Sequence, residues 1–211
     1  MGLRLRAAIK ILSVNLRHNF MPHLFIALVI AFLTQALFGI ASLDAREAAQ
    51  PLERLLSLTG TVLLTPIFLP EQNEDIRDLI RSKRTNYLAV CALRLACSIF
   101  FLAVVMGSFT YIMQCCESAV SFRHFVGGFA TALFLGSLGF LFAGISQNTI
   151  TGYMVSLIYY MINFGMKDEL KNLYLFSMSA GSFNEKYWLL GGSAVLMAAT
   201  FLWLCKASRT V

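Results

Sequence analysis

Six apolar segments, separated by polar stretches, set the main constraint on what this chain can fold into. A helix that crosses the hydrocarbon core of a bilayer needs about 20 mostly apolar residues. Only 13% of the 211 residues are charged, against about 25% in a typical soluble domain. The sequence therefore predicts an all-α membrane protein with a single transmembrane domain, 1–211. The predicted spans are 24–43, 55–70, 88–113, 125–146, 150–165 and 187–205.

Two of these spans, 55–70 and 150–165, are shorter than a bilayer requires. We expect each to extend by a turn into its flanks, or to be locally irregular where protein surrounds it. No cleavable signal peptide is apparent, because the first apolar run is long enough to span and follows about twenty amphipathic residues.

The distribution of lysine and arginine predicts the orientation in the membrane, because cytoplasmic loops carry an excess of both. With six spans the two termini lie on one face, and that face carries ten of these residues against six on the other. We therefore expect a multi-pass protein of the cell membrane with both termini in the cytoplasm. The net charge of +6 is accounted for by this topology, so nucleic acid is not an expected partner. The ten are Arg4, Arg6, Lys10, Arg17, Arg77, Arg81, Lys83, Arg84, Lys206 and Arg209, and the six are Arg46, Arg54, Arg123, Lys167, Lys171 and Lys186.

Two flanking segments have apolar faces suited to the membrane surface. Residues 1–22 combine apolar residues at helical spacing with basic residues elsewhere, which predicts an amphipathic interface helix; a plain basic tail is the alternative. The 166–186 segment carries Leu170, Leu173, Tyr174 and Phe176. We expect it to be an external loop with one or two short helices, the alternative being a simple exposed loop.

The most charged stretch, "EQNEDIRDLIRSKR" (71–84), follows the second span. Asn73 is a suitable N-cap, the acids come first and the bases last, and this order suits the helix dipole. Ile76, Leu79 and Ile80 fall on one face. The pattern predicts a short cytoplasmic helix over 73–84 whose apolar face packs under the bundle or binds a partner. The alternative is a solvated loop that serves only to orient the spans.

The segment "LPEQNEDIRDLIRSKRTNYLAVCALRL" resembles the region after the second helix of ABC-2-type transporter permeases. In that family a short cytoplasmic coupling helix leads into helix three and docks into the ATP-binding subunit. The rest of the predicted architecture is also similar, although the large external domain that many members carry between spans one and two is absent. The resemblance assigns ATPase coupling to Ile76, Arg77, Leu79, Ile80 and Arg81.

The resemblance also implies a set of partners and a direction of transport. The chain would pair with a second copy or a related permease, in contact with membrane lipid, and with ABC ATPase subunits that bind ATP and Mg. No cofactor would bind this chain. Export of a peptide, a lipid-linked molecule or a hydrophobic compound is expected by analogy alone.

The sequence lacks the patterns that would make this chain an enzyme. Neither a GxxxxGK[ST] phosphate-binding loop nor an HExxH zinc motif occurs. The five cysteines form no CxxC pair, so small apolar packing is their expected role. Ser137 has no histidine at membrane depth to activate it. Ala132 with Gly136, and Gly139 with Ala143, are instead spaced for close helix packing.

The polar residues inside the predicted spans are candidates for a transport pathway. Each is individually better explained by an interhelical hydrogen bond than by a substrate contact, but as a group they could line a pathway for an amphipathic substrate. Arg94 is the one charge inside a span, and it lies close enough to the cytoplasmic end to reach the interface. No acidic residue falls inside a predicted span, which argues against a proton relay. The candidate pathway residues are Gln35, Thr59, Tyr153, Tyr159 and Asn163.

A second class of function remains open at this stage. A membrane scaffold that transports nothing could recruit a cytoplasmic partner through the same 73–84 helix. The two hypotheses share the docking helix and differ in whether ATP hydrolysis drives the chain.

Overall fold

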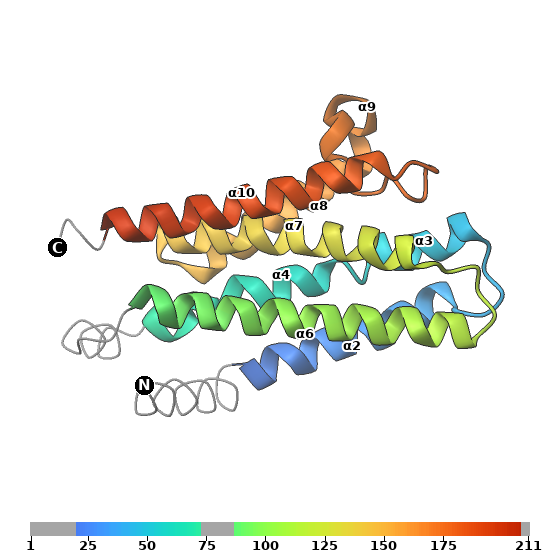
Figure 1. Cartoon of the computed structure of the whole chain (residues 1–211), viewed down its shortest axis with the longest axis horizontal. Helices are drawn as coiled ribbons and strands as arrows, with labels where there is room; N and C mark the ends of the chain where they lie inside the picture. The colour runs from blue at the N-terminus through green and yellow to red at the C-terminus, as the bar shows by residue number, and fades with distance from the viewer. Residues whose placement is uncertain (1–19, 73–86, 208–211) are drawn as a thin grey trace.

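The computed structural model describes residues 20–72 and 87–207, and throughout those parts the regular structure is helical, as predicted (Figure 1). The predicted coupling helix, 73–84, and the predicted interface helix, apart from residues 20–22, lie outside the described residues. The elements are α2 (Met21–Phe38), α3 (Ala45–Arg54), α4 (Leu58–Leu64), the 3-10 helix η2 (Thr65–Gln72), α6 (Tyr87–Cys115), α7 (Phe122–Ser146), α8 (Thr149–Gly165), α9 (Lys167–Leu170), the 3-10 helix η3 (Lys171–Leu173) and α10 (Asn184–Ala207).

Five helical runs in the described residues are long and apolar enough to cross a membrane, judged by length and composition. They indicate a membrane protein. The remaining predicted span, 150–165, corresponds to α8, which has 17 residues and is not among the five. The five runs are Met21–Phe38, Ala45–Pro70, Leu88–Cys115, Phe122–Ser146 and Asn184–Lys206.

The second run begins at Ala45, ten residues before the predicted start at 55, and its helix is irregular. Pro51 lies inside α3, and two further prolines follow in η2. Proline lacks the amide hydrogen that an α-helix needs and clashes with the preceding turn. The run therefore changes from α-helix to turn, back to α-helix and then to 3-10 helix. Irregular backbone of this kind is tolerated at membrane depth where protein surrounds it. Protein does surround this run, because 72% of the residues in its apolar 18-residue segment are buried.

Helix α7 is the centre of the bundle, with α3, α4, α6, α8 and α10 packed against it. In the apolar 18-residue segment of α7, 67% of the residues are buried. The corresponding shares for α2 and α10 are 11% and 22%. The long helices run back and forth along one axis (Figure 1). One end of the bundle, which we call the α3 end, holds α3, α9 and the turn between α6 and α7. The opposite end holds the end of η2, the start of α6 and the turn between α7 and α8.

Small residues let α4, α7 and α8 approach one another closely at mid-bundle. A methyl group added at Gly60 would overlap the main-chain carbonyl of Ala132, and one added at Gly136 would overlap the carbonyl of Gly60. A methyl group at Gly152 would likewise overlap the carbonyl of Gly139. We call these five residues the small-residue crossing. The crossing confirms that Ala132, Gly136 and Gly139 serve close helix packing.

Candidate functional site

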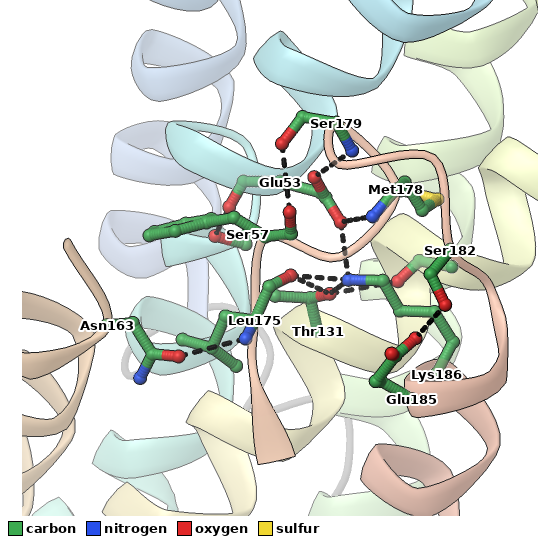
Figure 2. A network of polar contacts seen from close by, with 12 residues as sticks. Glu53, Ser57, Thr131, Asn163, Leu175, Met178, Ser179, Ser182, Glu185 and Lys186 are labelled. Atoms are coloured by element: carbon green, nitrogen blue, oxygen red, sulfur yellow. Dashed lines mark hydrogen bonds and ion pairs between the residues drawn. The ribbon is translucent and has the colours of Figure 1, made fainter. Parts of the chain in front are cut away.

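A buried ion pair joins α3 to the start of α10 at the α3 end. Lys186 Nζ lies 2.6 Å from Glu53 Oε1, and the two side chains are 3% and 0% exposed. Charged side chains are almost never fully buried unless they are paired. Figure 2 shows the pair surrounded by a loop, α7 and α10. This pair is the most unusual chemical feature of the described residues, so we treat it as the candidate site.

Every hydrogen-bond donor of the Lys186 ammonium group has a partner. Besides Glu53, Nζ donates to Thr131 Oγ1 at 2.7 Å and to the carbonyl of Leu175. Thr131 in turn donates to the carbonyl of Gly127 at 3.0 Å, one turn earlier in α7. A lysine has three donors and no acceptor, so this environment satisfies it completely. The arrangement leaves the amine with no lone pair or open donor for chemistry.

The Glu53 carboxylate is held from the other side by main-chain amides. The amide hydrogens of Met178 and Ser179 donate to Oε1 at 2.8 Å and to Oε2 at 3.0 Å. Hydrogen bonds to an ionised acceptor are roughly twice as strong as neutral ones. Helix α3 places Glu53 on the buried side of the bundle together with Ala49 and Leu52. The carboxylate therefore binds a lysine and a loop, and no acid–base role follows from its contacts.

The loop that the ion pair holds is the segment 175–179, which we call the strap. Asn163 Oδ1 on α8 accepts from the amide of Leu175 at 2.9 Å, while Lys186 on α10 binds the carbonyl of the same residue. One peptide segment thus bridges α8 and α10 (Figure 2). The Phe176 ring packs against Phe164 of α8 with 4.8 Å between ring centroids. Leu175, Phe176, Ser177 and Met178 are all buried.

The turns around this site are fastened in a similar way. His124, near the start of α7, places Nε2 2.9 Å from the carbonyl of Ala45 and accepts at Nδ1 from the amide of Ser121 at 3.2 Å. The neutral tautomer with hydrogen on Nε2 satisfies both contacts. Ser118 donates to the carbonyl of Ile40 at 2.6 Å and accepts from the amide of Leu43 at 3.2 Å. The start of α3 is therefore tied to the α6–α7 turn and to α7.

Tyr174 precedes the strap, and its phenol lies near enough to Glu53 and Arg54 for their charges to act on it. Burial raises the pKa of Tyr174, and the negative charge of Glu53 raises it further, while Arg54 opposes the shift. The phenol is therefore the neutral form at physiological pH, and it adds no charge to the site.

The five candidate pathway residues do not form one group. Tyr159 and Asn163 lie one turn apart on α8, where the Asn163 side chain donates to the carbonyl of Tyr159 at 2.8 Å and the Tyr159 hydroxyl donates to the carbonyl of Leu173 at 2.7 Å. Thr59 is buried and donates to the carbonyl of Leu56 at 2.6 Å. Gln35 lies on the exposed face of α2, and Tyr153 is half-buried on α8. The observed bonds of Thr59, Tyr159 and Asn163 go to protein main chain.

Arg94 is half-buried on α6, where its guanidinium donates to the carbonyl of Ile67 at 3.2 Å. It lines a small cavity with His23 and Ser98, between α2, η2 and α6. The predicted coupling residues Ile76, Arg77, Leu79, Ile80 and Arg81 lie outside the described residues. In the described part of the chain, no three or more His, Cys, Asp or Glu residues are grouped so that they could hold a metal ion.

The pairing of Glu53 with Lys186 was not predicted from the sequence. Both residues lie just outside the predicted spans, whereas the apolar run Ala45–Pro70 includes Glu53 and the run Asn184–Lys206 includes Lys186. One feature of the sequence could have indicated that Glu53 is buried. It falls on the same side of a helix as the apolar residues Ala48, Ala49 and Leu52, and a helix turns that side toward the core. Nothing in the sequence pointed from Glu53 to Lys186, 133 residues later.

No family model matches the chain, and neither a curated protein nor a solved structure matches it.

Proposed function

We propose that this chain is the permease subunit of an ABC-2-type transporter, and that it has no catalytic activity of its own. In this proposal α8 also spans the membrane, which brings the number of spans to six. Both termini lie in the cytoplasm, and the chain pairs with a second copy or a related permease. ATPase subunits supply ATP hydrolysis through the 73–84 segment. The substrate class is a peptide, a lipid-linked molecule or a hydrophobic compound, and the direction is export.

The observation that carries the proposal is the 71–84 stretch and its likeness to the coupling region of that family. Its acids and bases are sorted from one end to the other, and it carries an apolar triplet at helical spacing. The helical architecture supports this proposal. η2 ends and α6 begins at the bundle end where α10 also ends (Figure 1), and this is the end that the distribution of lysine and arginine predicts to be cytoplasmic.

The contacts at the ion pair support a transport subunit over an enzyme. Glu53 and Lys186 satisfy each other and the surrounding main chain. A catalytic acid, base or nucleophile must instead reach a reacting group. The ion pair is therefore no candidate for a catalytic site.

The test is to express the chain with its co-encoded neighbours and purify it by a tag on the chain. We expect a P-loop ATPase to co-purify. Changing Leu79 and Ile80 to aspartate should remove the ATPase while the chain still inserts in the membrane, because two charges would enter an apolar docking face. Ser82→Asp is the matched control and should retain the ATPase.

Two results would contradict the proposal. An ATPase that stays bound to the Leu79→Asp, Ile80→Asp chain would remove the coupling assignment. A different cytoplasmic protein lost on the same change, with no ATPase in the parent complex, would favour the scaffold hypothesis.

A further inference from the structure

We infer that residues 175–179 form a releasable strap between α8 and α10, and that the Glu53–Lys186 ion pair is the latch that keeps it in place. All contacts of the strap and the latch lie within this chain, so neither depends on an ATPase partner.

Side chains from other segments hold the strap by binding its main-chain groups. Four side chains bind four of its backbone groups. Asn163 binds the amide of Leu175, and Glu53 binds the amides of Met178 and Ser179. Lys186 and Thr131 both donate to the carbonyl of Leu175. A segment without a regular helical ladder needs such partners wherever its backbone is buried. Loss of the latch would leave several of these groups unsatisfied at the same moment, so the strap should release as a unit.

A buried ion pair is well suited to a latch and poorly suited to plain stabilisation. The cost of removing both charges from water largely cancels their attraction, so apolar replacements of such pairs are often neutral or stabilising. Losing one partner is different, because it leaves a buried charge uncompensated. The pair therefore makes the closed position distinct from open ones while adding little to the net stability of the bundle.

The backbone on both sides of the strap has residues in the left-handed region. Lys171 has φ 38° and Gly181 has φ 90°. Glycine adopts such angles without strain, whereas lysine rarely does. These positions bracket the strap and are where the chain changes direction toward α8 and toward α10. They are the natural hinges for a movement that leaves both helices intact.

The strap covers a specific part of α7. Leu175 and Phe176 belong to the same buried cluster as Ala130 and Leu135 of α7. Met178 lies so close to Gly127 that a methyl group added there would overlap its sulfur atom. Release of the strap would therefore admit water to the α7 surface around Ala130, between α8 and α10.

Thiol labelling of the purified full chain in detergent measures this release. The five native cysteines are replaced by alanine, and Ala130→Cys provides a single thiol beneath the strap. With Glu53 intact we expect slow labelling by a water-soluble thiol reagent, because Ala130 is fully buried. With Glu53→Gln added, labelling should accelerate at least about tenfold, a shift of about 1.4 kcal/mol in the opening equilibrium. Asn163→Ala should act in the same direction.

Two controls separate release of the strap from general loosening. Glu47→Gln changes an exposed acid on the same helix and should leave the rate unchanged. The native thiol at Cys91, restored alone, is buried in α6 away from the strap and should not respond to Glu53→Gln. An unchanged rate at position 130, or an equal acceleration at Cys91, would overturn the inference.

A second measurement leaves the ion pair intact, in case Glu53→Gln prevents folding. Met178→Cys in the same background places the thiol on the strap itself, at a position that is 2% exposed. Labelling then reports spontaneous opening, and we expect it to be at least about tenfold faster than at Cys91, which is 1% exposed. Equal rates at the two positions would show that the strap does not open apart from the bundle.

Discussion

The small-residue crossing and the latch at the α3 end hold helices together by two different physical means. At the crossing, glycines remove side chains so that backbones touch, and the attraction is dispersion. At the latch, charged and polar side chains reach between segments and bind main-chain groups. Apolar burial alone does not drive helices together in lipid. The crossing therefore fixes the bundle itself, whereas the latch fixes the strap, the part that we propose can move.

The largest predicted effect breaks the crossing. Gly60→Leu should prevent recovery of a folded, monodisperse chain, because even its first side-chain carbon overlaps the main chain of Ala132. Overpacking that neighbouring side chains can relieve typically costs about 1–3 kcal/mol, but a main-chain carbonyl in a helix cannot rotate away. Size-exclusion chromatography in detergent, with thermal unfolding of any recovered protein, measures the result.

Gly191→Leu is the matched control for this prediction. Gly191 lies on α10 with no atom within 4 Å of the added carbon, so this variant should fold like the parent. Equal behaviour of the two variants would mean that α4 and α7 do not need their close approach.

The second prediction breaks the latch. Lys186→Met should lower the free energy of unfolding by about 3–5 kcal/mol, since it leaves the Glu53 carboxylate buried without its counter-charge. Glu53→Gln in addition should restore part of that loss, because it removes the charge and keeps an oxygen for the amides of the strap. Denaturant unfolding of the parent, the two single variants and the double variant completes a double-mutant cycle.

The coupling energy between Lys186→Met and Glu53→Gln shows whether the two charges interact in the folded chain. Costs that simply add would show that the two charges do not interact in the folded chain. A double variant more stable than Lys186→Met would support the different roles of crossing and latch.

The part of this comparison that the sequence could predict is the crossing. Glycine and alanine at positions 132, 136 and 139 share one face of a helix, so a local pattern was sufficient. The all-helical class followed from the apolar segments in the same way. The early start of the second run was missed because Arg46, Glu47, Glu53 and Arg54 lower its average hydropathy, although the bundle buries Glu53.

The latch could not be predicted because its parts are distant in the sequence and bind main chain. The strap's hydrogen bonds depend on the fold of residues 174–183, which carry no periodic pattern. Asn163 was identified as polar within a span, but its partner is the amide of Leu175. Side-chain chemistry alone does not distinguish such a positioning contact from a residue that lines a pathway.

The smallest predicted effect sharpens the comparison by testing ordinary apolar contacts on one helix. Leu189 and Leu202 both lie on α10, fully buried and 71% exposed respectively. Leu189→Ala should cost about 2–5 kcal/mol, because it removes a buried side chain and leaves a cavity. Leu202→Ala should change stability by less than about 0.5 kcal/mol, since a lipid tail is as apolar as the side chain that it replaces. Thermal or denaturant unfolding in detergent micelles measures both.

A loss of stability above about 1 kcal/mol for Leu202→Ala would mean that protein covers this face of α10. If that loss depended on protein concentration, the covering protein would be a second copy of the chain. The crossing and the latch would then be the internal contacts of one protomer, and the exposed side of α10 a third kind of contact between protomers.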